Sequence, residues 1–130
     1  MQYLEGKSLD ELEEKPTEEE VWKWSRELIS AVHMCHVQAK LAHRDIKPEN
    51  IKLKGDANDL VLYDFGHSLI FEDGNDLVDD TAGTYSFFSP ELFVPATVDN
   101  PKIMHAKRCD IWALGVTIFM VAAERHPFDD

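Results

Sequence analysis

The sequence predicts an α+β fold that is mainly α-helical and contains one short β-hairpin. Two stretches indicate helices: residues 18–38 repeat apolar side chains at helical spacing, and residues 116–123 are apolar all round, as in a buried helix. Two short runs rich in leucine, isoleucine and valine flank the turn sequence Gly-Asp-Ala-Asn at residues 55–58, which predicts the hairpin. At 130 residues, the chain has about the length of one average domain.

Two helices are expected near the start of the chain. Residues 10–15 are mostly acidic, and we expect them to form a short helix that ends at Pro16. Thr17 and Glu20 then have the spacing of a capping box, which marks the start of a helix. We therefore expect the long helix to span residues 18–38, with its aromatic and apolar stripe in the core.

The hairpin is expected to consist of residues 51–54 and residues 59–63. Asn50 comes directly before its first strand, and Asp64 comes directly after its second strand. Because the two strands of a hairpin run in opposite directions, Asn50 and Asp64 are expected to lie together at its open end.

Two loops and a helix are expected after the hairpin. Residues 72–80 are acidic, contain glycine and lack periodicity, so they are expected to form a mobile loop. Residues 92–107 contain proline and asparagine and are expected to form an insertion-like loop. The last helix is expected over residues 110–123 and is followed by His-Pro-Phe at residues 126–128.

The composition excludes several classes of function. A net charge of -12 argues against nucleic acid or an anionic membrane as a partner. The longest apolar run, residues 111–123, is shorter than the roughly 18 residues of a membrane span. Cys35 and Cys109 are too few for a disulfide framework, which favours an intracellular, cytoplasmic protein with reduced thiols. His33, Cys35 and His36 do not converge on a helix and are not expected to bind a metal. Nothing in the sequence indicates an oligomeric state.

Three motifs follow one another in a fixed order. Residues 43–50 read His-Arg-Asp-Ile-Lys-Pro-Glu-Asn, in which Asp45 precedes Asn50 by five positions. Asp-Phe-Gly follows at residues 64–66, and Ser-Pro-Glu follows at residues 89–91. In this order and spacing, the motifs resemble the catalytic domain of the eukaryotic-type serine/threonine protein kinases. The stretch from the hairpin onward most resembles the calcium/calmodulin-dependent kinase kinases.

The resemblance implies transfer of the γ-phosphate of ATP to serine or threonine hydroxyls of protein substrates. Asp45 would accept the proton of the attacking hydroxyl, and Lys47 would lie against the transferred phosphate. Asn50 and Asp64 would bind Mg²⁺, which prefers such oxygen ligands. Residues 43–50 would form the catalytic loop, and Asp110 would anchor its backbone. Phosphoryl transfer requires little covalent help from the protein, so catalysis depends mainly on positioning and charge neutralisation.

The first nine residues resemble the hinge that binds adenine in kinases. Met1 would be the gatekeeper, the backbone of Gln2 to Leu4 would hydrogen-bond adenine, and Ser8 would lie near the ribose. Lys52 would lie under the adenine ring, where the family usually has an apolar residue.

A second departure from the family precedes the Asp-Phe-Gly motif, where Tyr63 replaces a smaller residue and would narrow the nucleotide pocket. Two interpretations of Lys52 and Tyr63 stay open. Lys52 could cover adenine with its methylene stem while its ammonium reaches water, so that both residues are tolerated. Alternatively, both residues weaken or alter nucleotide binding.

Residues 64–91 would form the activation segment. Counting back from Gly-Thr at residues 83–84, the place of the usual activating phosphothreonine is occupied by Asp80. We hypothesise that Asp79 or Asp80 supplies a fixed negative charge for Arg44; the alternative is a solvated acidic loop.

Two threonines in this segment are also candidates for function. Thr81 is a lesser candidate for phosphorylation. Thr84 would bond Asp45 and Lys47, and together with Lys47 it favours serine and threonine substrates over tyrosine.

The resemblance covers nearly the whole chain, yet residues 1–130 correspond to only part of a kinase domain. They would supply the hinge, catalytic loop, activation segment and central helix, without the smaller lobe and the last helices. The arginine that pairs with Glu91 in kinases would be missing as well, leaving a buried carboxylate unpaired. Three hypotheses follow: the catalytic segment of a serine/threonine kinase within a longer chain, a kinase-like binding module, or an inactive truncated fragment.

Overall fold

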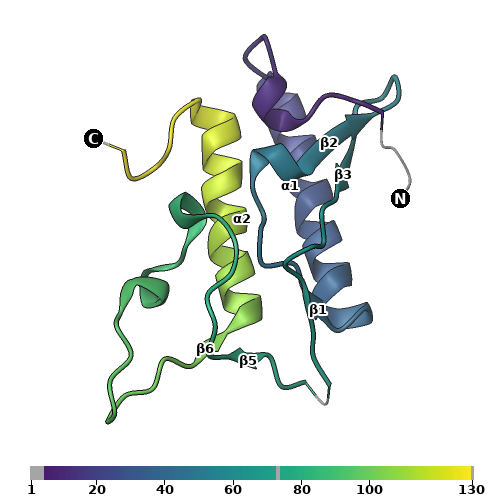
Figure 1. Cartoon of the computed structure of the whole chain (residues 1–130). Helices are drawn as coiled ribbons and strands as arrows, with labels where there is room; N and C mark the ends of the chain where they lie inside the picture. Colours follow the sequence, from purple (N-terminus) through teal and green to yellow (C-terminus); the bar gives the residue numbers. More distant parts are fainter. Residues whose placement is uncertain (1–4, 73, 130) are drawn as a thin grey trace.

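Two long helices, α1 (Glu18–His33) and α2 (Ala106–Ala123), lie side by side and form the centre of the molecule (Figure 1). The computed structural model describes residues 5–72 and 74–129. The predicted α+β fold is confirmed, since the helices are accompanied by short antiparallel strand pairs. Within the described part of the chain, neither helix is long and apolar enough to cross a membrane.

Helix α1 begins as its capping box predicts. The Thr17 hydroxyl accepts a hydrogen bond from the backbone N–H of Glu20 at 3.2 Å, and the Glu20 carboxylate accepts one from the N–H of Thr17 at 2.8 Å. After His33 the chain continues as a π-helical turn, Met34–Gln38, so the predicted extent of 18–38 is confirmed. The buried stripe of α1 consists of Trp24, Leu28 and Val32.

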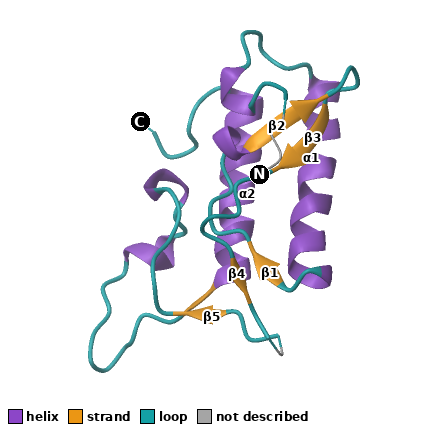
Figure 2. Ribbon diagram, turned by 45° about the vertical axis from the view of Figure 1, so that its right-hand side comes forward, coloured by secondary structure: helices purple, strands orange, loops and turns teal. Residues whose placement is uncertain are grey.

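The hairpin consists of β2 (Ile51–Lys54) and β3 (Asp59–Leu62), paired in antiparallel register from Ile51 opposite Leu62 to Lys54 opposite Asp59. It packs on the N-terminal part of α1, where the indole N–H of Trp24 donates to the carbonyl of Asn58 at 3.1 Å. Figure 2 shows the hairpin and strand β1 near opposite ends of α1. The predicted hairpin is therefore confirmed, with its second strand one residue shorter than expected.

Two further strand pairs were not predicted. Strand β1 (Leu41–Ala42) pairs with β4 (Leu69–Ile70), and β5 (Leu77–Val78) pairs with β6 (Met104–His105). The expectation of an irregular loop over residues 72–80 is therefore wrong for β5. A two-residue strand carries no detectable period, and its partner lies far away in the sequence.

The short helix expected over residues 10–15 is also wrong. The chain forms only a 3₁₀ turn, Leu9–Glu11, and Leu12 is already extended with ψ of 126°. A longer helix would bring the like charges of Asp10 and Glu14 together, since residues four apart are neighbours on a helix surface. Burial of Leu9 holds the single turn in place.

Helix α2 is buried on one face only, which corrects the expectation of burial all round. Within residues 116–123, Val116 and Thr117 are buried, whereas Ala122 is exposed and the others are half-buried. The helix also begins at Ala106, four residues before the expected start, so the predicted loop of residues 92–107 ends earlier than expected.

Candidate active site

The loop between β1 and β2 is held by a buried carboxylate from α2. Asp110 is 1% exposed, and its Oδ2 and Oδ1 accept the backbone N–H groups of His43 and Arg44, both at 2.8 Å. The side chain of His36 also donates to Oδ2 from 2.8 Å. Arg44 has a φ of +71°, a conformation that non-glycine residues rarely adopt. The predicted anchoring contact of Asp110 is thus present, and it stabilises a strained turn.

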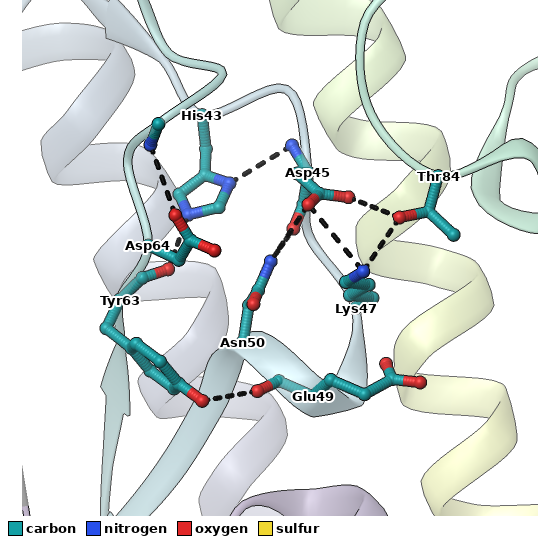
Figure 3. A network of polar contacts seen from close by, with 9 residues as sticks. His43, Asp45, Lys47, Glu49, Asn50, Tyr63, Asp64 and Thr84 are labelled. Atoms are coloured by element: carbon teal, nitrogen blue, oxygen red, sulfur yellow. Dashed lines mark hydrogen bonds and ion pairs between the residues drawn. The ribbon is translucent and has the colours of Figure 1, made fainter.

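The Asp45 carboxylate lies at the centre of a polar network (Figure 3). It is only 7% exposed, and its Oδ1 accepts a hydrogen bond from the Thr84 hydroxyl at 2.7 Å. The side-chain amide of Asn50 donates to Oδ2 at 3.1 Å and to the Asp45 carbonyl at 2.8 Å. Lys47 places its Nζ 3.7 Å from Oδ2 and donates to the Thr84 hydroxyl oxygen at 2.9 Å. The structure therefore brings together Asp45, Lys47, Asn50 and Thr84.

His43 joins this loop to the open end of the hairpin. Its Nδ1 accepts the backbone N–H of Asp45 at 3.1 Å, so its Nε2 carries the proton that is donated to the Tyr63 carbonyl at 2.9 Å. The ring of Phe65 contacts His43 edge-on, with centroids 4.8 Å apart. Sequence reasoning missed this role of His43, which depends on a contact 20 residues away in the chain.

Asn50 and Asp64 flank the open end of the hairpin, as predicted, because the N–H of Tyr63 donates to the Asn50 carbonyl at 3.0 Å. The amide nitrogen of Asn50 points at Asp45, which directs its amide oxygen the other way. Asp64 is exposed and has a φ of +60°, and its Oδ1 accepts the N–H of Gly66 at 3.3 Å. An amide oxygen and a carboxylate are the hard donors that Mg²⁺ takes in proteins, so these residues fit the ion.

The residues expected to bind the nucleotide are only partly described. Met1, Gln2 and Leu4 lie outside the described residues. Ser8 is buried and forms an isolated β-bridge with Lys52.

Lys52 and Tyr63 lie next to each other beside the site. The Nζ of Lys52 lies 5.0 Å from the centre of the Tyr63 ring. The Tyr63 hydroxyl donates to the Glu49 carbonyl at 2.5 Å, which fixes the ring beside Asn50 (Figure 3). Partial burial raises the pKa of the Tyr63 phenol, and nearby carboxylates such as Asp10 and Asp64 add to this rise.

Arg44 directs its side chain at Asp80, as hypothesised. The Arg44 Nη2 and the Asp80 Oδ2 are 2.8 Å apart and form a close ion pair. The orientation of the two groups does not satisfy the geometry of a hydrogen bond. Asp80 itself is 62% exposed, so water screens this attraction. Thr81 is exposed, and Asp79 is exposed as well.

The segment that carries Thr84 approaches the loop between β1 and β2 at Gly83. Gly83 has a φ of +106°, and a Cβ at this position would lie 2.3 Å from the Arg44 carbonyl oxygen. Only glycine fits here, both for its backbone conformation and for the space.

Replacing Gly83 by alanine is expected to lower the free energy of unfolding by about 2 kcal/mol or more, because strain and a backbone clash act together. Gly55→Ala is the matched control: Gly55 also has a positive φ, of +70°, but nothing lies within 4 Å of its added Cβ. Thermal unfolding of both variants separates the two effects. Equal losses of stability would show that the close approach to Arg44 contributes nothing.

The environment of Glu91 differs from expectation. It was expected to be a buried carboxylate without a partner, but Glu91 is exposed and its Oε1 lies 3.9 Å from the Cys109 sulfur. Solvent hydrates this carboxylate, so its burial cost does not arise in the structure.

Comparisons with known proteins agree with the motifs. A family model described as a protein kinase domain matches residues 1–130. The chain is 33% identical over 132 aligned positions to the SNF1-like protein kinase ssp2 of Schizosaccharomyces pombe, covering 100% of the chain and 21% of that protein. It is 35% identical to the carbon catabolite-derepressing protein kinase of Saccharomyces cerevisiae, covering 90% of the chain and 17% of the relative.

A plant relative is similar to the same degree. The CBL-interacting serine/threonine-protein kinase 2 of Arabidopsis thaliana is 38% identical, covering 89% of the chain and 24% of the relative. The chain therefore spans about a fifth of the length of these curated relatives. Their names do not bear on the resemblance to calcium/calmodulin-dependent kinase kinases, which stays a prediction.

Proposed function

The chain belongs to the protein kinase family, and we propose that it is the catalytic segment of a serine/threonine kinase within a longer protein. In this proposal residues 1–130 supply the hinge, catalytic loop, activation segment and central helix of the kinase domain. The reaction is the transfer of the γ-phosphate of ATP to a serine or threonine hydroxyl of a protein substrate. The observation that carries the proposal is the Asp45 carboxylate, nearly buried and fixed by Thr84 and Asn50.

Asp45 is the proton acceptor in this proposal. The substrate hydroxyl oxygen forms the new bond to the γ-phosphorus, the bond to the bridging oxygen of ADP breaks, and Asp45 takes the hydroxyl proton. Hydrogen bonds from Thr84 and Asn50 orient the carboxylate before the substrate arrives. This orientation supports catalysis because phosphoryl transfer depends mainly on positioning.

Lys47 is the group that contacts the transferred phosphate. Its hydrogen bond to Thr84 holds the ammonium beside Asp45. Asn50 and Asp64 would hold Mg²⁺, which when bound neutralises charge on the phosphates of ATP. For the nucleotide itself we propose the first residues of the chain, Met1, Gln2 and Leu4, with Ser8 and Lys52 beside them.

The choice of acceptor tests the proposal. In the full-length protein, with ATP and Mg²⁺, matched peptides with a serine, threonine or tyrosine acceptor are compared for incorporation of the γ-phosphate. We expect labelling of the serine and threonine peptides, and we expect Thr84→Val to reduce it because Lys47 loses its partner. Labelling of the tyrosine peptide at the same rate would contradict the assignment.

The Arg44–Asp80 ion pair supports partial independence from activating phosphorylation. A carboxylate carries less charge and fewer acceptor oxygens than a phosphate, so it is expected to order the segment only in part. We predict that Asp80→Ala lowers kcat/KM of the unphosphorylated full-length protein by about 5- to 50-fold, within the range of typical coupling between sites. Asp79→Ala, an exposed neighbour, is the control. If Asp80→Ala leaves the activity unchanged, the idea fails.

A second candidate function, a kinase-like binding module, is favoured by Lys52 and Tyr63. The Tyr63 ring is fixed beside Asn50 by its bond to Glu49, and Lys52 lies near that ring. If the ring excludes adenine, Tyr63→Ala binds ATP more tightly than the wild-type protein in calorimetric titration. Equal or weaker ATP binding by this variant would favour the enzyme.

We further propose that the protein acts on protein substrates in a reducing, intracellular setting. Cys35 and Cys109 are both free thiols. Burial is the main cause that raises the pKa of each thiol, so both stay in the unreactive neutral form.

A further inference from the structure

Among the described residues of the acidic run 72–80, Asp76 is a buried carboxylate that the proposed reaction does not use. Asp76 is 5% exposed, whereas Asp79 and Asp80 are exposed. The two oxygens of Asp76 reach the beginning of α2. Oδ2 accepts the backbone N–H of Lys107 at 3.0 Å, and Oδ1 accepts from the His105 Nδ1 at 3.0 Å. A third bond runs from the N–H of Ala106 to the Asp76 carbonyl at 2.9 Å.

These contacts replace a missing helix cap. The residue before α2, His105, makes no capping hydrogen bond with its side chain, so the first N–H groups of the helix need another acceptor. Asp76 provides that acceptor from 31 residues away in the sequence. Its negative charge is also favourable at the positive end of a helix.

The surrounding contacts agree with a fixed position for Asp76. Burial alone would raise the pKa of this carboxyl, but the hydrogen bonds from His105 and Lys107 outweigh burial and lower it. Directly after Asp76, strand β5 pairs with β6, with Leu77 opposite His105. The charged and titratable groups around this carboxylate are thus the His105 ring and Lys107.

The same turn of α2 leads to the catalytic loop. Asp110, three residues after Lys107, holds the backbone N–H groups of His43 and Arg44 at 2.8 Å. In the other direction, Asp76 lies four residues before Asp80, which pairs with Arg44. The contacts therefore form a closed circuit. It runs from Asp76 through the first turn of α2 to the catalytic loop, and from Arg44 in that loop back to Asp80 in the activation segment.

We propose that Asp76 is a positioning residue that couples the activation segment to the catalytic loop through the first turn of α2. Without its carboxylate, the N–H of Lys107 loses its acceptor and the first turn of α2 opens more often. Asp110 is then less firmly placed, and the N–H groups of His43 and Arg44 lose their acceptor for part of the time. This proposal rests on the proposed function only where it calls the loop catalytic.

Hydrogen exchange of the full-length protein, followed by mass spectrometry of its peptides, tests the coupling without requiring activity. Asp76→Ala is compared with Asp79→Ala, an exposed aspartate three positions away. We expect Asp76→Ala to speed exchange by about five- to tenfold, the factor that corresponds to loss of a helix cap. The faster exchange is expected in the peptides that cover residues 104–110 and residues 43–46. The hairpin strands β2 and β3 are the internal reference and are expected to keep their rates.

Two results would overturn the proposal. Faster exchange confined to residues 104–110 would make Asp76 a helix cap and nothing more. An equal rise in every segment, hairpin included, would mean a general loss of stability. If Asp76→Ala does not fold, Asp76→Asn serves in its place, because it keeps the size and one acceptor oxygen while removing the charge.

Activity gives a second readout. With Asp76→Ala we expect a lower kcat with the KM for ATP unchanged, because the loop that carries Asp45 is displaced while the nucleotide site is not. An unchanged kcat together with unchanged exchange in residues 43–46 would contradict the coupling. Absence of phosphoryl transfer in the wild-type protein would instead count against the proposed function. The hydrogen-exchange result would still test the coupling, because it does not require activity.

Discussion

Replacing Asp110 by alanine is expected to lower the free energy of unfolding by about 3–5 kcal/mol. The side chain is 1% exposed and accepts hydrogen bonds from the N–H groups of His43 and Arg44 and from the His36 ring. Alanine offers none of these acceptors, so three donors are left without a partner in a largely buried place. Leaving buried donors unsatisfied costs more than the net stabilisation of the bonds themselves.

Denaturant unfolding of Asp110→Ala measures this loss, with Arg108→Ala as the control. Arg108 lies on the same turn of α2 but is exposed, and its truncation is expected to change stability by less than about 0.5 kcal/mol. The effect of Asp110→Ala is expected to reach beyond α2, because the strained backbone of Arg44 depends on this carboxylate. A loss below about 1 kcal/mol would mean that the loop is held by other contacts.

Replacing Asp45 by asparagine is expected to lower kcat by about 10²- to 10⁴-fold, the usual contribution of a positioned proton acceptor. Asparagine has nearly the same shape and keeps an oxygen that can accept the hydrogen bond of Thr84. It cannot take up the proton of the attacking hydroxyl. The KM for ATP is expected to change little, because Asp45 is not among the residues proposed to bind the nucleotide or Mg²⁺.

Steady-state kinetics of the full-length protein checks this prediction, and Asp59→Asn is the control. Asp59 is an exposed carboxylate at the start of β3, on the hairpin but away from Asp45. We expect its kcat to match the wild-type value. A kcat for Asp45→Asn within tenfold of the wild-type value would remove Asp45 from the role of proton acceptor.

The sequence predicts most of the site because its residues lie in short, ordered patterns. Asp45, Lys47 and Asn50 belong to one run of eight residues, and the hairpin that follows brings Asp64 to the same end. The contacts of Thr84 with Asp45 and Lys47 were predicted from the resemblance and are present at 2.7 and 2.9 Å. Their roles in catalysis stay predictions.

What the sequence could not predict depends on contacts between distant segments. Asp76 looks like any other carboxylate in an acidic run, and its burial arises only when β5 meets β6 and α2 begins beside it. His43 is part of a recognised motif, yet its contact with Tyr63 appears only in the folded chain. Local periodicity carries no information about such pairs.

The error over residues 10–15 has a different origin. The acidic residues predicted a helix there, but their charges repel one another on a helix surface. None of residues 10–15 is buried, so no packing offsets this repulsion. The exposed face of α2 shows a related point. An apolar sequence indicates that a helix can be buried on every side, but the neighbouring elements determine which face is buried in the fold.

Single-turnover transfer of the γ-phosphate from ATP to a serine peptide is the most direct measurement of the central claim. It is made with the full-length wild-type protein and with Asp45→Asn, in the presence of Mg²⁺ and after its removal by a chelator. Mg²⁺-dependent transfer to the serine hydroxyl by the wild-type protein, lost in Asp45→Asn, is the predicted result. Binding of ATP by both proteins without any transfer would contradict a kinase and leave a nucleotide-binding module.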